Sequence, residues 1–203
     1  MKRPYIVGLT GQSGSGKSTV STEFEQNGFY VINCDKMTHI LLQPDTDCCK
    51  ALKEKYPQFF DGNVFNRRKA ASLLFSDSQL LESYNSTIFP FINAEISRRI
   101  EEAWASGNGL ILLDAPTLFE AGAEKLCDTV VSCIADIDVR TERIIRRDGI
   151  SKQDALKRFA SQHDESFFIE HSDHIIENNG SIENTKKAAE RITKEIKEKV
   201  NGN

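Results

Sequence analysis

The sequence predicts an α/β fold in which parallel strands alternate with helices and a mostly helical segment is inserted near the middle. Short apolar runs that suit buried strands recur along the chain, at residues 5–7, 28–32, 110–113, 129–134 and 174–176. Helical patterns fill most of residues 36–107, between the second and third runs. A glycine-rich loop follows the first run and precedes a helical pattern over 18–27. This order of strand, loop and helix is typical of α/β proteins that bind phosphate.

Length, charge and cysteine usage limit the classes of protein to consider. The 203 residues fit one domain, and a net charge of −4 gives no overall basic field that would draw the chain to nucleic acid. The five cysteines form no C-x-x-C pair or Cys/His pattern, which favours reduced thiols over disulfides or a zinc site. No apolar stretch approaches 18 residues, and the first strand leaves no room for a signal peptide. We therefore expect a cytoplasmic protein with no membrane partner.

The glycine-rich loop carries the pattern G-x-x-x-x-G-K-[ST] between Gly11 and Ser18, which is a P-loop. Glycines let backbone N–H groups approach a triphosphate closely, and the following helix adds the positive end of its dipole. Lys17 supplies a cation for the β and γ oxygens, and the Ser18 hydroxyl suits Mg²⁺. Thr19 stands where a dinucleotide fingerprint would need its third glycine, which excludes that motif. The predicted nucleotide-binding residues are Gly11, Ser13, Gly14, Ser15, Gly16, Lys17, Ser18 and Thr19.

Two carboxylates come directly after predicted strands, at the edge of a parallel sheet where ligands bind. Asp35 follows the strand at 28–32 and is suited to accept a proton from a substrate hydroxyl or to hold Mg²⁺ through water. An N-cap for a helix over 36–42 is an equally good interpretation of Asp35. Asp114 follows the strand at 110–113 and is predicted to orient the water shell of the metal, with an ordinary loop carboxylate as the alternative.

The inserted segment reads as turns followed by three helices. Turn signals dominate residues 43–62, and a helix begins at Arg67-Arg68-Lys69. Asp77 is expected to cap a helix to Ile88, Pro90 to interrupt it, and a third helix to run over 91–105. Three cations at a helix start are unfavourable for the helix dipole, which suggests a binding role, although a solvated basic face is the commoner reason for such a run.

Arginines crowd the segment after the strand at 129–134, where Arg140, Arg143, Arg146 and Arg147 fall within eight residues of an acidic protein. Arginine stacks on bases and spans phosphate oxygens, so we favour a lid over a solvated charged face. The three histidines at 163, 171 and 174 read as surface residues. A terminal helix from Ser181 is predicted to bury a stripe of apolar residues, namely Ile182, Ala189, Ile192, Ile196 and Val200.

From Ile6 to about Gly180 the chain resembles the dephospho-coenzyme A kinase family. Besides the P-loop, the matching positions are Val31-Ile32 to Asp35, Asp61-Gly62 with Arg67, Asn85 with Pro90, Pro116 through Glu120, Arg143 and Arg147, Arg158 with Gln162, and Asp173 through Gly180. Many families share a P-loop, whereas this ordered set is specific. The resemblance implies a single three-layer P-loop kinase domain over 1–203, with a five-stranded parallel sheet. The core would comprise about 1–35, 108–139 and 173–203, with a helical acceptor-binding insert at about 36–107 and a lid at about 140–172.

The resemblance also implies the reaction and the roles of the residues. It implies transfer of the γ-phosphoryl group of MgATP to the ribose 3′-hydroxyl of dephospho-coenzyme A, the last step of coenzyme A synthesis. In such an enzyme Asp35 is similar to the base, Lys17 and Arg143 to the clamp on the transferring group, and Arg147 to a lid cation near the nucleotide. The remaining matched positions fall in the adenine loop, Asn178 and Asn179, or on the acceptor side, Arg67, Asn85 and Pro116.

Three departures from the family pattern concern the acceptor side more than the ATP side. The family usually has Asp-Ala-Asp where this chain has Asn33-Cys34-Asp35, His-Pro at Phe89-Pro90, and Pro-Leu-Leu at Pro116-Thr117-Leu118. Two alternatives therefore stay open: a P-loop kinase for another nucleotide or nucleoside-like acceptor, and a nucleotide-dependent binding module without turnover. A GTP switch is disfavoured because the chain has no N-K-x-D motif.

Overall fold

The structure, a computed structural model, describes residues 3–202 and divides the chain into two compact units. The sheet unit contains the chain up to Ile32 and from Ile100 onward, and the helical unit contains Asn33–Arg99. None of the helices within residues 3–202 is both long and apolar enough to cross a membrane. We describe the two units separately.

The sheet unit is built on a five-stranded parallel sheet, which confirms the predicted fold class. Its strand order is β2-β5-β1-β6-β7, so the strand that carries the P-loop is central. The register pairs Leu9 with Asp114 on one side of β1 and Gly11 with Cys133 on the other. The strands are β1 (Tyr5–Gly11), β2 (Tyr30–Asn33), β5 (Leu110–Asp114), β6 (Thr129–Ile134) and β7 (His174–Glu177).

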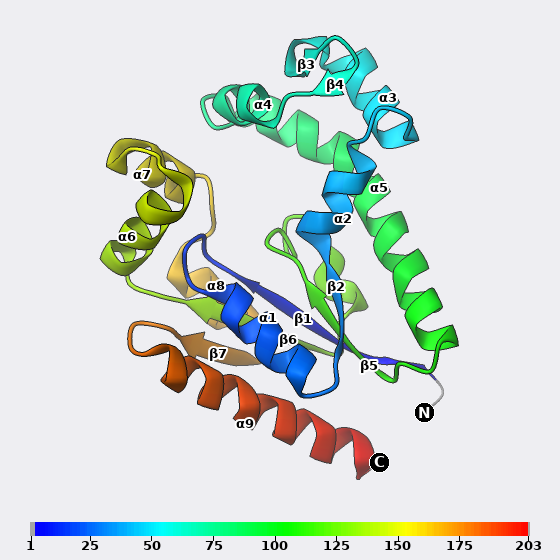
Figure 1. Cartoon of the computed structure of the whole chain (residues 1–203), viewed down its shortest axis with the longest axis vertical. Coiled ribbons are helices and arrows are strands. Elements are labelled where there is room, and N and C mark those ends of the chain that lie inside the picture. The colour runs from blue at the N-terminus through cyan, green and yellow to red at the C-terminus, as the bar shows by residue number, and fades with distance from the viewer. Residues whose placement is uncertain (1–2, 203) are drawn as a thin grey trace. The chain divides into compact units, whose positions relative to one another are not determined.

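Helices cover both faces of this sheet. On one face, α1 (Lys17–Gln26) and α9 (Ile182–Asn201) pack side by side (Figure 1). Val131 and Cys133 of β6 belong to the core beneath them. Because side chains alternate along a strand, Ser132 points to the opposite face. There its hydroxyl lies 2.6 Å from that of Ser172, just after α8 (Glu165–His171). The result is the predicted arrangement of three layers.

The apolar stripe of α9 is buried as predicted over most of its length. Ala189, Ile192 and Ile196 are at most 2% exposed and pack in the core, and Val200 is half-buried against it. Ile182, in contrast, is 66% exposed. The prediction for Ile182 was wrong because α9 begins only a short loop after β7 ends. Its first turn therefore lies beyond the carboxyl edge of the sheet, where no strand can cover it.

Two more helices follow β6 in the segment predicted to form a lid. They are α6 (Ile137–Asp148) and α7 (Lys152–Ala160), which pack against each other. Before β6, the chain forms a 3-10 turn, η2 (Ala123–Leu126). Gly149 ends α6 in the left-handed conformation, and the Ser151 side chain caps α7.

The helical unit packs around a cluster of aromatic rings. Tyr56, Phe59 and Tyr84 have ring centroids 5.3–6.1 Å apart, and Phe60 and Phe65 extend the cluster. Its elements are α2 (Cys34–Leu41), α3 (Asp47–Lys55), η1 (Pro57–Phe59), the hairpin of β3 (Phe60–Asp61) and β4 (Val64–Phe65), α4 (Arg67–Leu74) and α5 (Ser78–Ala105) up to Arg99. Helix α3 was not predicted, because turn signals dominate residues 43–62.

The predicted break at Pro90 is wrong, because α5 continues through it from Ser78 to Ala105. Proline removes one helical N–H and so deprives the carbonyl of Ser86 of its donor. Both Pro90 and Ser86 are exposed, so water can satisfy that carbonyl. Ile88, Ile92 and Ile96 are buried, and their packing outweighs the local cost of about 3 kcal/mol. The predicted cap at the start of this helix is confirmed, since Asp77 accepts hydrogen bonds from the backbone of Gln79 and Leu80.

Candidate active site

The P-loop connects β1 to α1 and depends on glycine for its close packing. Gly11 and Gly16 have φ of 144° and 93°, which other residues rarely adopt. A Cβ atom on Gly11 would lie 2.1 Å from the carbonyl oxygen of Cys133, and one on Gly16 would lie 2.0 Å from Nδ2 of Asn178. The lack of a Cβ at Gly11 and Gly16 is therefore needed for the loop to pack against Cys133 and Asn178. It also allows a ligand to approach the backbone of the loop closely.

The start of α1 offers unsatisfied backbone donors to an anion. Gly16 is its N-cap in the left-handed conformation, and no side chain of the described residues caps the helix. The first N–H groups of a helix need partners, and the helix dipole favours a negative one. Ser18 is exposed in this first turn. Loop and helix together fit the phosphates of a nucleotide.

Lys17 and Asp114, which the sequence assigned to phosphate and to metal, form an ion pair with each other. Their side chains are only 16% and 4% exposed. The pairing follows from the sheet, because β5 neighbours β1 and places Asp114 beside Leu9, close to where the loop begins.

Magnesium would have few protein ligands here. The described residues contain no group of three His, Cys, Asp or Glu side chains able to hold a metal. Mg²⁺ typically takes one or two protein ligands and completes its shell with water and substrate phosphates. Ser18 and Asp114 fit that limited role.

Arg143 joins the P-loop to the loop after β7. Its Nη1 donates to the carbonyls of Gly14 and Ser15 at 3.3 and 3.4 Å. Its Nη2 donates to the carbonyl of Asn178 at 3.0 Å. Four predicted site residues on three separate segments are thus brought together.

The two asparagines of the loop after β7 point in different directions. Asn178 is 5% exposed and donates from Nδ2 to the Ser15 carbonyl at 2.7 Å. Asn179 is exposed and exchanges two hydrogen bonds with Asp136, accepting from its backbone N–H at 2.7 Å and donating to its carboxylate at 2.9 Å. This division could not be predicted from the sequence, because the two side chains are chemically identical.

Arg147 contacts Asp148, its neighbour in α6, instead of the P-loop. Its Nε and Nη2 donate to the carboxylate at 2.6 and 2.9 Å, and Arg158 of α7 donates to the same carboxylate at 2.7 Å. Hydrogen bonds from these two guanidinium groups lower the pKa of Asp148 to about 2. The side chain of Arg147 is 63% exposed. Asp148 thereby links α6 to α7.

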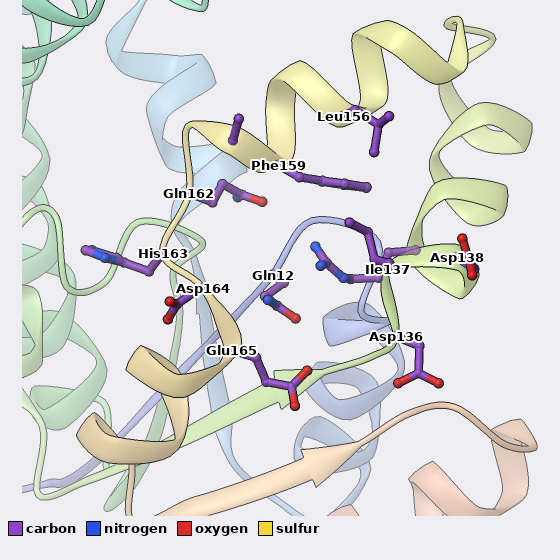
Figure 2. A pocket seen from close by; sticks show the side chains of 12 residues that line it. Gln12, Asp136, Ile137, Asp138, Leu156, Phe159, Gln162, His163, Asp164 and Glu165 are labelled. Carbon is purple, nitrogen blue, oxygen red and sulfur yellow. The ribbon is translucent and has the colours of Figure 1, made fainter.

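A cavity of about 750 Å³ lies beside the first half of the P-loop (Figure 2). Gln12 of the loop lines it, together with Phe159 and Gln162 at the end of α7. The Gln162 side chain accepts a hydrogen bond from the backbone of Ser13 at 3.1 Å, a contact with the nucleotide loop that sequence reasoning missed.

Arg140 also lines this cavity and does not serve as a surface cation. It is 7% exposed, lies over the ring of Phe159 at 4.5 Å, and donates from Nε to the carbonyl of Ala135 at 2.8 Å. Burial lowers the pKa of its guanidinium. The arginine cluster in the sequence therefore contains residues with different roles.

The helical unit holds three of the predicted acceptor-side residues. Asp35 is exposed in the first turn of α2, whose N-cap is Asn33, with a 2.9 Å hydrogen bond from the backbone of Lys36. The alternative of Asp35 as N-cap is therefore wrong, because the helix begins before it. Arg67 is exposed at the start of α4, and Asn85 is half-buried in α5.

Pro116 lies in the sheet unit, where its carbonyl accepts a hydrogen bond from the Thr10 hydroxyl at 3.3 Å.

A loop of this geometry, opening from the central strand of a parallel sheet and braced by an arginine of a following helix, is the phosphate site of the P-loop kinases. The fold and the site place the chain in that class. Comparison with known proteins narrows it, because the family model for dephospho-CoA kinase matches residues 5–184. The chain belongs to the dephospho-CoA kinase family.

Individual relatives agree over nearly the whole length. The dephospho-CoA kinase of Corynebacterium efficiens is 33% identical over 193 residues, covering 94% of this chain and 96% of that protein. That of Syntrophotalea carbinolica is 34% identical over 184 residues, covering 89% and 87%. Among solved structures, TT1252 from Thermus thermophilus superposes with a TM-score of 0.79 at 28% identity, covering 96% of this chain and 98% of that one.

Proposed function

We propose that this protein transfers the γ-phosphoryl group of ATP to the ribose 3′-hydroxyl of dephospho-coenzyme A, which gives coenzyme A and ADP in the last step of coenzyme A synthesis. The observation that supports it most strongly is the match to dephospho-CoA kinases over residues 5–184. That match includes the helical unit as well as the P-loop, so it bears on the acceptor as well as on the nucleotide.

The sheet unit would bind the nucleotide. Backbone N–H groups of the P-loop and the start of α1 face the phosphates, and Lys17 and Arg143 stabilise the charge of the transferring group. Ser18 and Asp114 would hold Mg²⁺, which neutralises phosphate charge when bound. Asn179 and Arg147 are exposed, and we expect them to contact the rest of the nucleotide.

The helical unit would bind the acceptor. Asp35 would accept the proton of the 3′-hydroxyl, a role that the exposed carboxylate is free to fill because Asn33 already caps α2. Arg67 and Asn85 would contact the acceptor, together with Pro116 of the sheet unit. Arg67 suits this task because an exposed guanidinium can bind a phosphate of the acceptor through two N–H groups.

We expect the reaction to take place in the cytoplasm. The described residues contain no disulfide, and Cys34, Cys48, Cys49 and Cys133 are buried. Five cysteines without a disulfide support a reducing compartment.

The test is an acceptor panel. The protein is incubated with MgATP and, separately, dephospho-coenzyme A, adenosine, AMP and shikimate, and ADP release is followed in each case. We expect turnover with dephospho-coenzyme A and a product whose new phosphate is placed on the 3′ position by phosphorus NMR. Faster turnover with another acceptor would assign the chain a different substrate, and ATP binding without turnover on any acceptor would favour a binding module.

A further inference from the structure

Asn178 is held in one orientation by hydrogen bonds on both ends of its amide. The Thr185 hydroxyl of α9 donates to Oδ1 at 2.7 Å, and Arg143 approaches the same oxygen at 3.4 Å. With its oxygen occupied by donors, the amide presents Nδ2 to the P-loop, where it donates to the Ser15 carbonyl at 2.7 Å. Asn178 and Thr185 are 5% and 2% exposed, so water does not compete for these bonds.

The Ser15 carbonyl is the point on which three segments converge. Besides Asn178, it accepts from the Cys133 thiol of β6 at 3.2 Å and from Arg143 of α6 at 3.4 Å. Ser15 itself is fully buried. The carbonyl therefore points into the protein with little freedom to rotate.

The direction of this carbonyl decides the direction of a phosphate donor. The carbonyl of Ser15 and the N–H of Gly16 belong to the same trans peptide unit, so they point in opposite directions. Holding the carbonyl toward Asn178 turns the Gly16 N–H outward, to the side of the loop where phosphates bind. Gly16 lacks a Cβ that would otherwise overlap Nδ2 of Asn178.

We propose that Asn178 is a positioning residue for nucleotide phosphates. It fixes the Ser15–Gly16 peptide of the P-loop, Thr185 fixes the orientation of its amide, and its side chain does not recognise the adenine base. This proposal rests on phosphate binding at the P-loop but not on the identity of the acceptor.

The experiment compares binding of two probes, ATP and inorganic triphosphate, by calorimetry. Asn178→Asp keeps the shape but sets an oxygen against the Ser15 carbonyl, and we expect it to weaken both probes equally, by about tenfold or more. The preference of the protein for ATP over GTP should stay unchanged. A loss confined to ATP, with a changed ATP/GTP preference, would mean that Asn178 recognises the base and would overturn the proposal.

A second pair of variants protects the test against misfolding at position 178. Thr185→Val removes the hydroxyl at constant shape and should weaken both probes by about tenfold, whereas Thr185→Ser keeps the hydroxyl and should restore binding. Thr193→Val is the matched control, because Thr193 is 1% exposed in the same helix and its hydroxyl donates to the backbone carbonyl of Glu190. If Thr185→Val binds as tightly as Thr193→Val, the proposal is refuted.

Failure of the proposed function would look different. In that case the wild-type chain would bind ATP and triphosphate but would not phosphorylate dephospho-coenzyme A, and the effect of Asn178→Asp on binding would persist.

Discussion

The P-loop lysine Lys17, at the start of α1, and the carboxylate Asp114, at the end of β5, form a nearly buried ion pair. Each is also a candidate for the chemistry, Lys17 with the phosphates and Asp114 with the metal. Substitution of either residue is therefore expected to change stability and activity together, and the two effects must be separated.

Lys17→Ala should lower kcat by about 10²–10³ or more, because phosphoryl transfer depends mainly on fixed positive charge around the transferring group. It should also destabilise the fold by about 3 kcal/mol, since Asp114 loses its cation while it stays buried. Denaturant unfolding and steady-state kinetics on the same sample measure both.

The double variant Lys17→Ala with Asp114→Asn separates the two effects. We expect it to recover most of the stability, because the buried negative charge is gone, but none of the activity. A double variant no more stable than Lys17→Ala would show that the ion pair is not the source of the stability loss.

Asp35→Asn should lower kcat by about 10²–10⁴ while ATP and the acceptor still bind, because an amide cannot take the hydroxyl proton. A loose transition state would put the effect at the lower end of this range. Stability should change by less than about 1 kcal/mol, since Asn33 and not Asp35 caps α2. Kinetics with dephospho-coenzyme A and calorimetry with each substrate provide the measurements.

Asn33→Ala serves as the comparison for Asp35→Asn. It should cost about 1 kcal/mol of stability through the lost cap. Unchanged kcat in Asp35→Asn would remove Asp35 as the base, and loss of ATP binding alone would make it a metal-site residue.

Arg143→Ala and Arg147→Ala should differ in kind. Arg143 contacts two P-loop carbonyls, so its loss should mainly lower kcat. Arg147 is exposed and bound to Asp148 instead of the P-loop. Since we propose that it contacts the bound nucleotide, its loss should mainly raise KM for ATP. Steady-state kinetics with varied ATP distinguishes the two, and wild-type behaviour of both variants would mean that the arginines form a solvated face.

Asp148 should make stability depend on pH in the acid range. Its pKa in the folded protein is about 2, below the ordinary value of 3.8, because Arg147 and Arg158 stabilise its charged form. Its contribution is therefore complete above about pH 4 and is lost as the pH falls toward 2. Wild type should exceed Asp148→Asn in unfolding free energy at pH 6, and the difference should shrink by pH 3.

Salt provides the control for the Asp148 prediction. Because these side chains are near the surface, 0.5 M salt, with a Debye length of about 4 Å, should reduce the difference between wild type and Asp148→Asn at pH 6. A difference that is independent of both pH and salt would mean that Asp148 acts through packing and not through charge.

The parts of this protein that depend on local pattern could be predicted from the sequence. Gly11 to Ser18 marked the P-loop because phosphate binding needs particular residues at fixed spacing, and the apolar runs marked all five strands of the sheet because buried parallel strands need continuous apolar residues. Asp77 was identified correctly as a helix cap for the same reason, since a cap bonds only its near neighbours.

Contacts between side chains across the fold could not be predicted in this way, because they depend on tertiary packing. The pairing of Lys17 with Asp114 joins residues 97 positions apart, and the contact of Asn178 with Ser15 joins residues 163 apart, so neither leaves a local signal. Burial likewise decided that α5 continues through Pro90 and that Ile182 at the start of α9 stays exposed. Local propensity sets the free-energy cost of each conformation, but the packing of distant segments decides whether the fold is stable enough to offset that cost.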